Sequence, residues 1–285
     1  MEQSDIDLPY FDEILALAAA SPAADLVRTL GTRHVHWGCY ADAATRDDSV
    51  EGLVVAAEAL TERLVALAGI ADGQRVLDVG CGFGGTVAHL NESYSDMDLT
   101  GLNIDARQLE RARTLVTARP GNRVTFVQGD ASGHNEGLAD GGFDRVMAVE
   151  CIFHFPSRRR FFREARRLLR PGGRLVLSDF VPYGPDIPWL MPWLLLHRRE
   201  MGRFYGTVNY FPPMTAWGYG VLAKLTGFRL VVDEDITANT LPTYPVLLRI
   251  FGEVGHAPAA RATEHVAYFS RVGWVRYRLL AFEAV

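Results

Sequence analysis

The spacing of hydrophobic residues changes from one segment of the chain to the next. Several short segments are rich in aliphatic and aromatic residues, which is typical of β-strands. Longer segments have apolar residues at every third or fourth position, as in a helix with one buried face. The short apolar segments predict seven strands, at about 75–79, 98–103, 123–128, 143–150, 175–179, 228–233 and 274–282. Because helical segments separate them, we expect an α/β fold.

Helical spacing marks the segments between these strands. Residues 49–68 form an amphipathic pattern that Ser49 can cap, and Asp105 is well placed to cap the helix after the second strand. Residues 158–169 carry an apolar stripe with arginines around it, which indicates a helix with a solvated basic face. Two short helices are expected within residues 10–30.

Two further segments resemble insertions. Residues 182–227 are dense in aromatic side chains, and residues 238–271 are expected to be mainly helical. Aromatic density of this kind suits a lid over an apolar substrate, although a plain helical packing layer would use many of the same residues. We therefore expect an N-terminal helical cap segment, 1–70, and a main domain, 71–285, with lid insertions at about 182–227 and 238–271.

The first predicted strand ends in a glycine-rich turn. Gly80, Gly82 and Gly84 alternate there, and a helix is expected to open at about Val87. Glycine allows backbone dihedrals and close approaches that a Cβ would forbid, so a ligand can lie against bare backbone. Free N–H groups at the start of the helix favour an anionic group. Dinucleotide sites and methyl-donor sites share this arrangement, and the glycines alone do not separate them.

Composition narrows the class of protein. With 285 residues, of which 48% are hydrophobic and 22% charged, the chain suits one large globular domain with insertions. A formal charge of −5 gives no electrostatic reason to expect a nucleic-acid partner. The most apolar run, 187–196, is interrupted by prolines and is far shorter than the roughly 20 residues of a membrane span. No stable membrane insertion is expected, while shallow membrane contact stays open.

The cysteines and histidines suggest neither a disulfide framework nor a metal site. Cys39, Cys81 and Cys151 are far apart and form no CxxC pair, and the acidic N-terminus lacks the order of a signal peptide, so a cytoplasmic protein is expected. His34 and His36 have a spacing that two metal ligands can use. Spacing identifies no third ligand, and we therefore expect no metal.

The residues around the glycines resemble a known motif. The run from Val76 to Gly85 is similar to the first motif of the class I, Rossmann-like methyltransferases that depend on S-adenosylmethionine (SAM), and Leu169-x-Pro171-Gly172-Gly173 is also typical of that family. The resemblance covers roughly residues 32–179 and is greatest to small-molecule enzymes of the tocopherol, sarcosine and sugar group. It implies a seven-stranded, mostly parallel sheet with an antiparallel last strand. In the family the residue at Asp78 helps hold the amino end of the methionine moiety.

The resemblance also implies roles for the tips of the next two strands. Asn103 lies where the family reads the ribose, although most members have an acidic residue there, and Gln108 faces the donor in a subset of members. A solvated helix position is the alternative for Gln108. Asp130 and Ala131 match the residues that meet the adenine, with an ordinary aspartate turn as the alternative. The implied cofactor-binding residues are Trp37, Asp78, Gly80, Cys81, Gly82, Gly84, Asn103, Ile104, Gln108, Asp130, Ala131 and Glu150.

Candidate catalytic residues follow the fourth strand and precede the core. Glu150 and His154 resemble the family's fourth motif, in which the histidine lies near the transferring methyl, and an imidazole there can accept a proton near neutral pH. A half-buried structural histidine is the alternative. Trp37 and Tyr40 belong to a segment similar to one that closes over the methyl donor in related enzymes. Cys39 stands where that pattern usually has tyrosine, so Tyr40 is kept as a third catalytic candidate.

These observations predict a SAM-dependent methyltransferase that acts on a small, apolar or aromatic, natural-product-like molecule and releases S-adenosylhomocysteine (SAH). Two alternatives are kept. A methyltransferase fold that retains SAM but performs a cyclisation or isomerisation would carry the same motifs. The other alternative is a nicotinamide-dependent dehydrogenase or a non-catalytic nucleotide-binding module. The Gly-Asp-Ala sequence at 129–131 counts against both. The acceptor atom stays undetermined, and a homo-oligomer is left open.

Overall fold

A seven-stranded sheet forms the centre of the computed structural model, which describes Pro9, Asp12 and residues 33–41, 47–206, 208–209, 214–253 and 255–285. The strands are β1 (Arg75–Val79), β2 (Asp98–Asn103), β3 (Arg123–Gln128), β4 (Phe143–Ala148), β5 (Leu169–Pro182), β6 (Phe228–Asp235) and β7 (Val275–Ala284). Their order in the sheet is β3-β2-β1-β4-β5-β7-β6. The first five strands pair in parallel, and β7 runs antiparallel to both β5 and β6. The predicted seven strands and the antiparallel last strand are confirmed.

Helices occupy the predicted intervals. They are α3 (Val50–Ala68), α4 (Gly85–Ser93), α5 (Ala106–Leu115), α6 (Arg158–Leu168), α7 (Ile187–Tyr205), α8 (Ala216–Leu225), α9 (Thr237–Thr240), α10 (Thr243–Glu253) and α11 (Ala257–Val272), with short 3₁₀ turns η1 (Ile152–His154) and η2 (Gly184–Asp186). Both predicted caps are present: the Ser49 hydroxyl accepts from the Gly52 N–H at 2.9 Å, and Asp105 accepts from the Arg107 N–H at 2.8 Å. Apart from Asp12, the residues of the two helices expected within 10–30 lie outside the described residues.

Several boundaries differ from the prediction by a few residues, and two of these differences have a clear local cause. Residues 169–174, which precede the strand predicted at 175–179, already belong to β5, because Leu169 pairs with Phe143 and a register shift follows between Phe143 and Arg145. At the other boundary, β4 stops at Ala148 rather than Glu150. Glu150 has φ of 47°, a left-handed conformation that cannot continue a strand.

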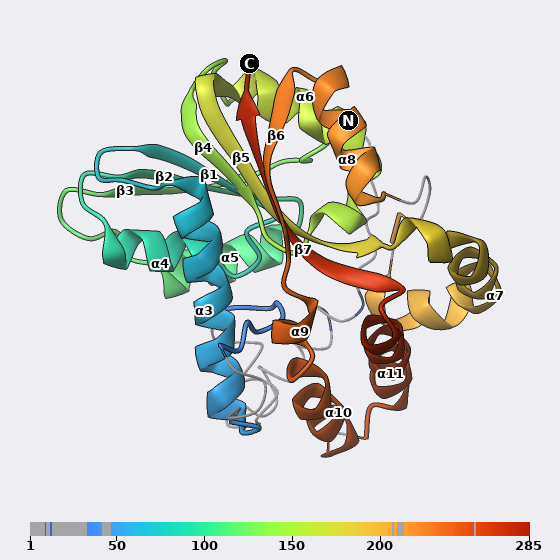
Figure 1. Cartoon of the computed structure of the whole chain (residues 1–285). Coiled ribbons are helices and arrows are strands. Elements are labelled where there is room, and N and C mark those ends of the chain that lie inside the picture. Colours follow the sequence, from blue (N-terminus) through green and yellow to red (C-terminus); the bar gives the residue numbers. More distant parts are fainter. Residues whose placement is uncertain are drawn as a thin grey trace.

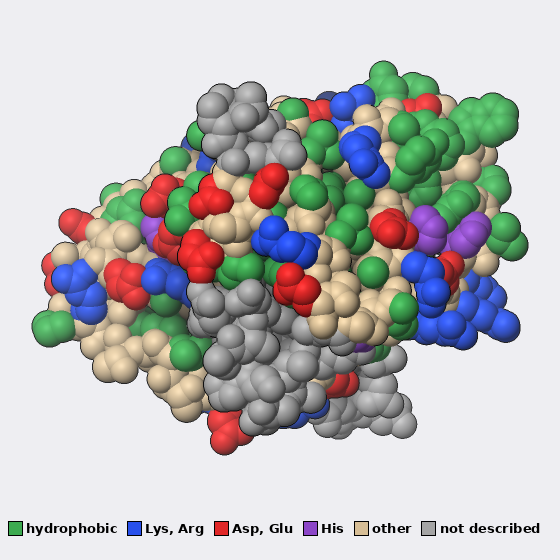
Figure 2. Space-filling model, turned by 90° about the horizontal axis from the view of Figure 1, so that it is seen from below, with side chains coloured by type: hydrophobic (Ala, Val, Ile, Leu, Met, Phe, Trp, Pro, Cys, Tyr) green, Lys and Arg blue, Asp and Glu red, His purple; other side chains and the backbone are tan. Residues whose placement is uncertain are grey.

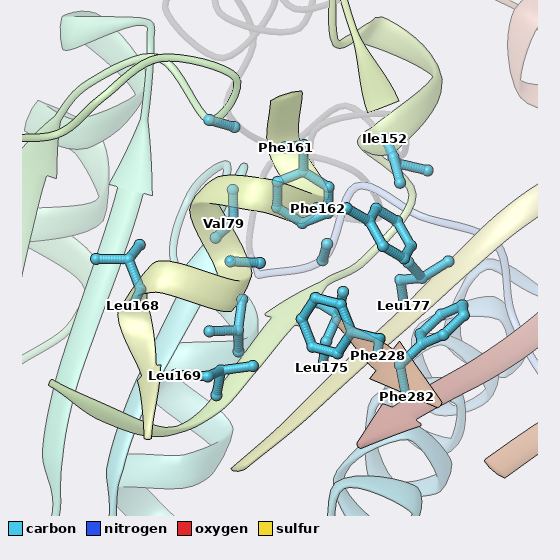
Figure 3. Close-up of a cluster of buried hydrophobic side chains, with 14 of the residues drawn as sticks. Val79, Ile152, Phe161, Phe162, Leu168, Leu169, Leu175, Leu177, Phe228 and Phe282 are labelled. Atoms are coloured by element: carbon cyan, nitrogen blue, oxygen red, sulfur yellow. The ribbon is translucent and has the colours of Figure 1, made fainter. Parts of the chain in front are cut away.

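Each face of the sheet is covered by its own set of helices. Helices α3, α4 and α5 pack on one face, where the buried cluster includes Leu60, Val87 and Val116 (Figure 1). Helices α6 and α8 pack on the other, where aromatic rings from both helices meet β6 and β7. Figure 3 shows part of this second cluster, in which the Phe162 ring contacts the rings of Phe161, Phe228 and Phe282. The result is a three-layer arrangement.

A separate helical group lies beyond the carboxyl ends of the parallel strands. Helices α7, α10 and α11 pack on one another and on the first turns of α3 through a third buried cluster that includes Leu53, Phe204 and Ile250 (Figure 1). Figure 2 looks onto this side, where hydrophobic side chains gather toward one edge and both signs of charge are present. Among the described helices, none has the length and apolar content needed to cross a membrane.

Candidate active site

The glycine turn after β1 has the backbone that its sequence predicts. Gly80, Gly82 and Gly84 all have positive φ, at 69°, 53° and 82°. A Cβ on Gly80 would lie 2.7 Å from the Cβ of Cys151, whereas a Cβ on Gly82 would meet no atom within 4 Å. Gly80 is therefore required for packing inside the protein, and Gly82 borders open space.

That open space is a cavity of about 90 Å³, here called the glycine-loop cavity. The turn, the tip of β2, residues 33–36 and the segment after β4 enclose it. Its lining residues are Arg33, His34, Val35, His36, Asp78, Gly80, Cys81, Gly82, Phe83, Gly85, Thr86, Asn103, Ile104, Gln108, Val149, Glu150, Cys151, His154 and Phe155. Nine of the residues implied by the sequence resemblance thus meet at one place: Asp78, Gly80, Cys81, Gly82, Asn103, Ile104, Gln108, Glu150 and His154.

Asn103 and Gln108 form a prearranged pair of amides at this cavity. The Asn103 Nδ2 donates to the Gln108 Oε1 at 2.9 Å, and the Asn103 Oδ1 accepts from the Ile104 N–H at 2.7 Å. Gln108 is only 1% exposed, so a solvated helix position is wrong. Its buried Nε2 has no hydrogen-bond partner among the described residues. Because an unsatisfied buried donor is costly, this nitrogen fits a ligand oxygen in the cavity.

Asp78 is a buried carboxyl group at the same cavity. Burial raises its pKa to about 8, and a hydrogen bond with Thr86 only partly opposes that rise. Below that pH the carboxyl is mostly protonated. A cationic group placed beside Asp78 would favour the carboxylate, as the ammonium of an amino acid does.

The His34 and His36 side chains are held by one another and by α3. The Nε2 of His36 lies 3.1 Å from the Nδ1 of His34, whose Nε2 lies 2.7 Å from the Glu58 Oε2. Burial, followed by the nearby His34, lowers the pKa of His36 to about 3, so His36 is neutral at physiological pH. The part of the chain that the structure describes contains no group of three or more His, Cys, Asp or Glu residues suited to a metal ion.

Glu150 forms hydrogen bonds both with the segment 33–41 and with the sheet. Its Oε1 accepts from the Trp37 N–H at 2.8 Å and from the Tyr277 hydroxyl, and its own N–H donates to the Ser178 Oγ at 3.0 Å. Burial raises the pKa of Glu150 to about 8, against the two hydrogen bonds to its side chain. These bonds hold the backbone of Trp37 next to Glu150, which lines the glycine-loop cavity.

A second, apolar cavity of about 140 Å³ lies among α7, α11, β5 and η1. We call it the apolar cavity. Its lining residues are Trp37, Phe153, Arg158, Phe180, Pro182, Leu190, Met191, Leu194, Met201, Tyr205, Val208, Asn209, Met214, Val266, Phe269 and Val275. Several come from the segments interpreted as lids, whereas Tyr219 is fully buried in the core between α8 and the sheet.

A small cavity of about 50 Å³ lies between these two and shares residues with both. It shares Glu150 and His154 with the glycine-loop cavity, and Trp37 and Phe153 with the apolar cavity. His154 is 5% exposed, and its ring centroid lies 4.4 Å from that of Phe153. We call this space the junction.

Four implied residues do not line these cavities. Gly84 is the N-cap of α4, and Asp130 accepts from the Ser132 N–H at 2.8 Å at the end of β3, next to the buried Ala131. Tyr40 is also buried, and its backbone pairs with Asn239. Their functional roles stay predictions.

Sequence reasoning missed the charged residue that lines the apolar cavity. Arg158 is the first residue of the arginine-rich helix α6, whose arginines were expected to face solvent, yet it is 8% exposed and pairs with the buried Asp179 at 3.3 Å. The first turn of α6 packs against the carboxyl edge of the sheet. There, the run of buried residues in β5 ends at Asp179. The position of Arg158 directly after the His154 segment was the only available signal.

The chain is similar in sequence to known methyltransferases. A sequence model described as a methyltransferase domain matches residues 77–177. Methyltransferase GfsG of Streptomyces halstedii is 32% identical over 263 residues, which span 89% of this chain and 89% of that protein. The chain belongs to the Rossmann-like, SAM-dependent methyltransferases. It is an enzyme of the small-molecule type within that family, so the dehydrogenase and non-catalytic alternatives are excluded.

Solved structures agree with this methyltransferase fold. The cyclase SpnF has a TM-score of 0.72 at 19% identity and aligns over 98% of this chain and 97% of its own. The mycolic acid cyclopropane synthase CmaA1, solved with SAH and CTAB, has a TM-score of 0.77 at 16% identity and aligns over 98% and 100%. At these identities the likeness concerns the fold alone.

Proposed function

We propose that this methyltransferase binds SAM in the glycine-loop cavity and a small, largely apolar acceptor in the apolar cavity, and that the methyl group passes between them at the junction. The observation that carries the proposal is the shared lining: Glu150 and His154 border the glycine-loop side of the junction, and Trp37 and Phe153 border its apolar side. Two ligands seated in the two cavities would meet there.

The residues of the glycine-loop cavity fit SAM. Asp78 would face its ammonium group, and the bare backbone at Gly82 leaves room for the methionine and ribose portions. Asn103 and Gln108 would meet the ribose hydroxyls, which accept from the unpartnered Gln108 Nε2. Trp37, Cys81, Ile104 and Glu150 would close around the ligand, while Asp130 and Ala131 keep the adenine role that the family resemblance implies.

The acceptor class follows from the lining of the apolar cavity, since aliphatic and aromatic side chains surround it. This fits an apolar or aromatic natural-product-like molecule. Bound SAM supplies a sulfonium methyl group that is transferred by in-line displacement. The protein then contributes alignment and the exclusion of water, for which the packed rings of Trp37, Phe153 and Phe180 are suited.

Proton removal is the remaining task when the acceptor is a hydroxyl group. His154 is the first candidate base because it lines both the glycine-loop cavity and the junction. Glu150 has a pKa near 8 but already accepts two hydrogen bonds, and Tyr40 lines none of the three cavities described above. We therefore rank Glu150 and Tyr40 behind His154.

The domain division stays part of this proposal. Helix α7 and the segment of α10 and α11 act as lids over the apolar cavity, and residues before Ala71 close the glycine-loop side through the segment 33–41. Helix α8 lies within the first proposed lid but packs mainly against β6.

Calorimetric titration with SAH tests the donor site. Gly82→Asn should weaken binding by at least about 100-fold, because asparagine tolerates positive φ and its side chain would enter the cavity. Gly73→Asn is the matched control: Gly73 has φ of 79°, a Cβ there meets nothing within 4 Å, and it lies at the opposite end of β1. The control should bind SAH like wild type, and circular dichroism should show both variants folded. Wild-type affinity in Gly82→Asn would refute the assignment.

A further inference from the structure

Arg158 is a charged side chain in the lining of the apolar cavity, where burial makes a charge energetically unfavourable. Arg158 is 8% exposed and shares the lining with Phe180, Leu190 and Met214. Burying a guanidinium requires that its charge be paired and its N–H groups find acceptors. The cavity itself supplies few polar partners, so the contacts of this group decide what it can bind.

The charge of Arg158 is paired inside the protein. Its Nη2 lies 3.3 Å from the Oδ2 of Asp179, and the same oxygen accepts from the hydroxyl of Tyr219. Asp179 and Tyr219 are 0% exposed, which places the pair at the end of the core. Burial works to lower the pKa of Arg158, but Asp179 and Tyr219 outweigh it and the pKa is raised. The guanidinium therefore stays charged, and its charge opposes the rise that burial causes in the pKa of Asp179.

Its hydrogen bonds are incomplete. The Nη1 donates to the backbone oxygen of Asn209 at 3.1 Å, which ties α6 to the segment after α7. The Nε is buried and has no hydrogen-bond acceptor among the described residues. An orphaned N–H of a buried guanidinium costs more than one of a neutral group, and an oxygen of a bound molecule would remove that cost.

We propose that Arg158 binds a neutral oxygen of the acceptor, such as a carbonyl, ether or hydroxyl oxygen, and thereby selects oxygenated molecules over pure hydrocarbons of the same shape. This inference rests on the proposed function, in which the apolar cavity holds the acceptor. A neutral oxygen is favoured over a carboxylate because Asp179 already neutralises the guanidinium and repels a second negative charge. Arg158 is thus a specificity-determining residue.

Three probes that share a butylphenyl group test this: butylbenzene, 4-butylphenol and 4-butylbenzoate, titrated into the full chain with SAH present. The ratio of the dissociation constant of butylbenzene to that of 4-butylphenol should fall about tenfold or more in Arg158→Met, the scale of one hydrogen bond to a charged group. Because that variant leaves Asp179 unpaired, the double variant Arg158→Met with Asp179→Asn is measured as well and should show the same fall. Asp179→Asn alone should keep the phenol preference and bind 4-butylbenzoate at least about tenfold more tightly than wild type does.

Leu194→Trp locates the probes. Leu194 lines the apolar cavity from α7, and an indole there should abolish binding of all three molecules. A phenol preference that survives in both Arg158 variants would overturn the inference, as would tighter binding of 4-butylbenzoate than of 4-butylphenol by wild type. Failure of wild type to bind SAH would instead count against the proposed function, which the same titrations record separately.

Discussion

The glycine-loop cavity and the apolar cavity are lined in opposite ways. The first is bordered by bare backbone and by buried polar side chains at the ends of β1, β2 and β4, including Asp78 and Asn103. The second is bordered by apolar side chains of α7, α11 and β5, with Arg158 as its charged member. Polar groups fixed before binding suit one invariant ligand, whereas an apolar wall accepts a range of molecules of suitable shape. Under the proposed function, the glycine-loop cavity would serve the chemistry that the family shares, and the apolar cavity would determine the choice of acceptor.

His154 gives the largest expected effect, because it lies where the two sides meet. When the acceptor is a hydroxyl group, His154→Ala should lower turnover by about 10²-fold or more, the usual scale of general-base assistance. SAH affinity should change little, since the loss concerns proton removal. The measurement is methyl transfer from labelled SAM to the acceptor, followed against pH for both proteins. An acceptor without a proton to lose should show only a small decrease.

Wild-type turnover with an unchanged pH profile in His154→Ala would remove this residue from catalysis. The junction would then provide alignment alone, and Glu150 would become the next residue to test.

A variant of Asp130 tests the glycine-loop side of this comparison. The family resemblance assigns Asp130 to the adenine, although this residue does not line the glycine-loop cavity. Asp130→Ala should weaken SAH binding by about one to two orders of magnitude, as expected for a lost buried hydrogen bond of roughly 1–3 kcal/mol. Asp72→Ala is a matched control, because Asp72 also accepts a backbone N–H, that of Ser95 at 2.8 Å, but before β1. Equal calorimetric affinities for Asp130→Ala and the control would place the adenine elsewhere.

Much of the glycine-loop side was predictable because its determinants are contiguous in sequence. The turn at Gly80–Gly84, the Asn103 tip and the Asp105 cap each follow from a short pattern that also fixes local geometry. The orphaned Nε2 of Gln108 and the clamp of Glu150 on Trp37 were not predictable, because each depends on which side chain reaches which partner after folding.

For the apolar cavity, the sequence predicted the general character of the lining but not the contacts of individual residues. The aromatic density of 182–227 indicated a lid, yet Trp193 packs beside Phe269 of α11 and Tyr219 lies in the core. Arg158 looked like one more arginine of a solvated helix, because spacing along α6 carries no information about the strand tip against which its first turn packs. Contacts between such distant residues are set by tertiary packing.

A smaller effect is expected from the protonation of Asp78. Burial holds its pKa near 8 in the free protein, and the ammonium of SAH should lower that pKa, so binding near pH 6 should release about one proton. Affinity should therefore rise with pH up to about 8, by at most about tenfold per pH unit. Calorimetry in buffers of different ionisation enthalpy measures the release, and Asp78→Asn should abolish it. Proton uptake on binding, or a release unchanged in Asp78→Asn, would contradict this assignment.

The pH dependence that Asp78 gives to the stability of the free protein has the opposite sign to the pH dependence of SAH affinity. A folded-state pKa near 8, against the ordinary value of 3.8 for aspartate, means that the folded state binds more protons between these values. Asp78 therefore contributes stability at low pH that is lost as the pH rises from about 4 to about 8. Thermal unfolding of the unliganded protein over this range should show a shallower decline in Asp78→Asn.

The central claim is that two ligands occupy two separate cavities at the same time, and paired titrations of SAH and 4-butylphenol test it most directly. Each should bind wild type at one to one, with an affinity that saturation by the other changes by less than about threefold. Gly82→Asn should lose SAH alone, and Leu194→Trp should lose 4-butylphenol alone. Competition between the two ligands, or loss of both from either variant, would contradict the account.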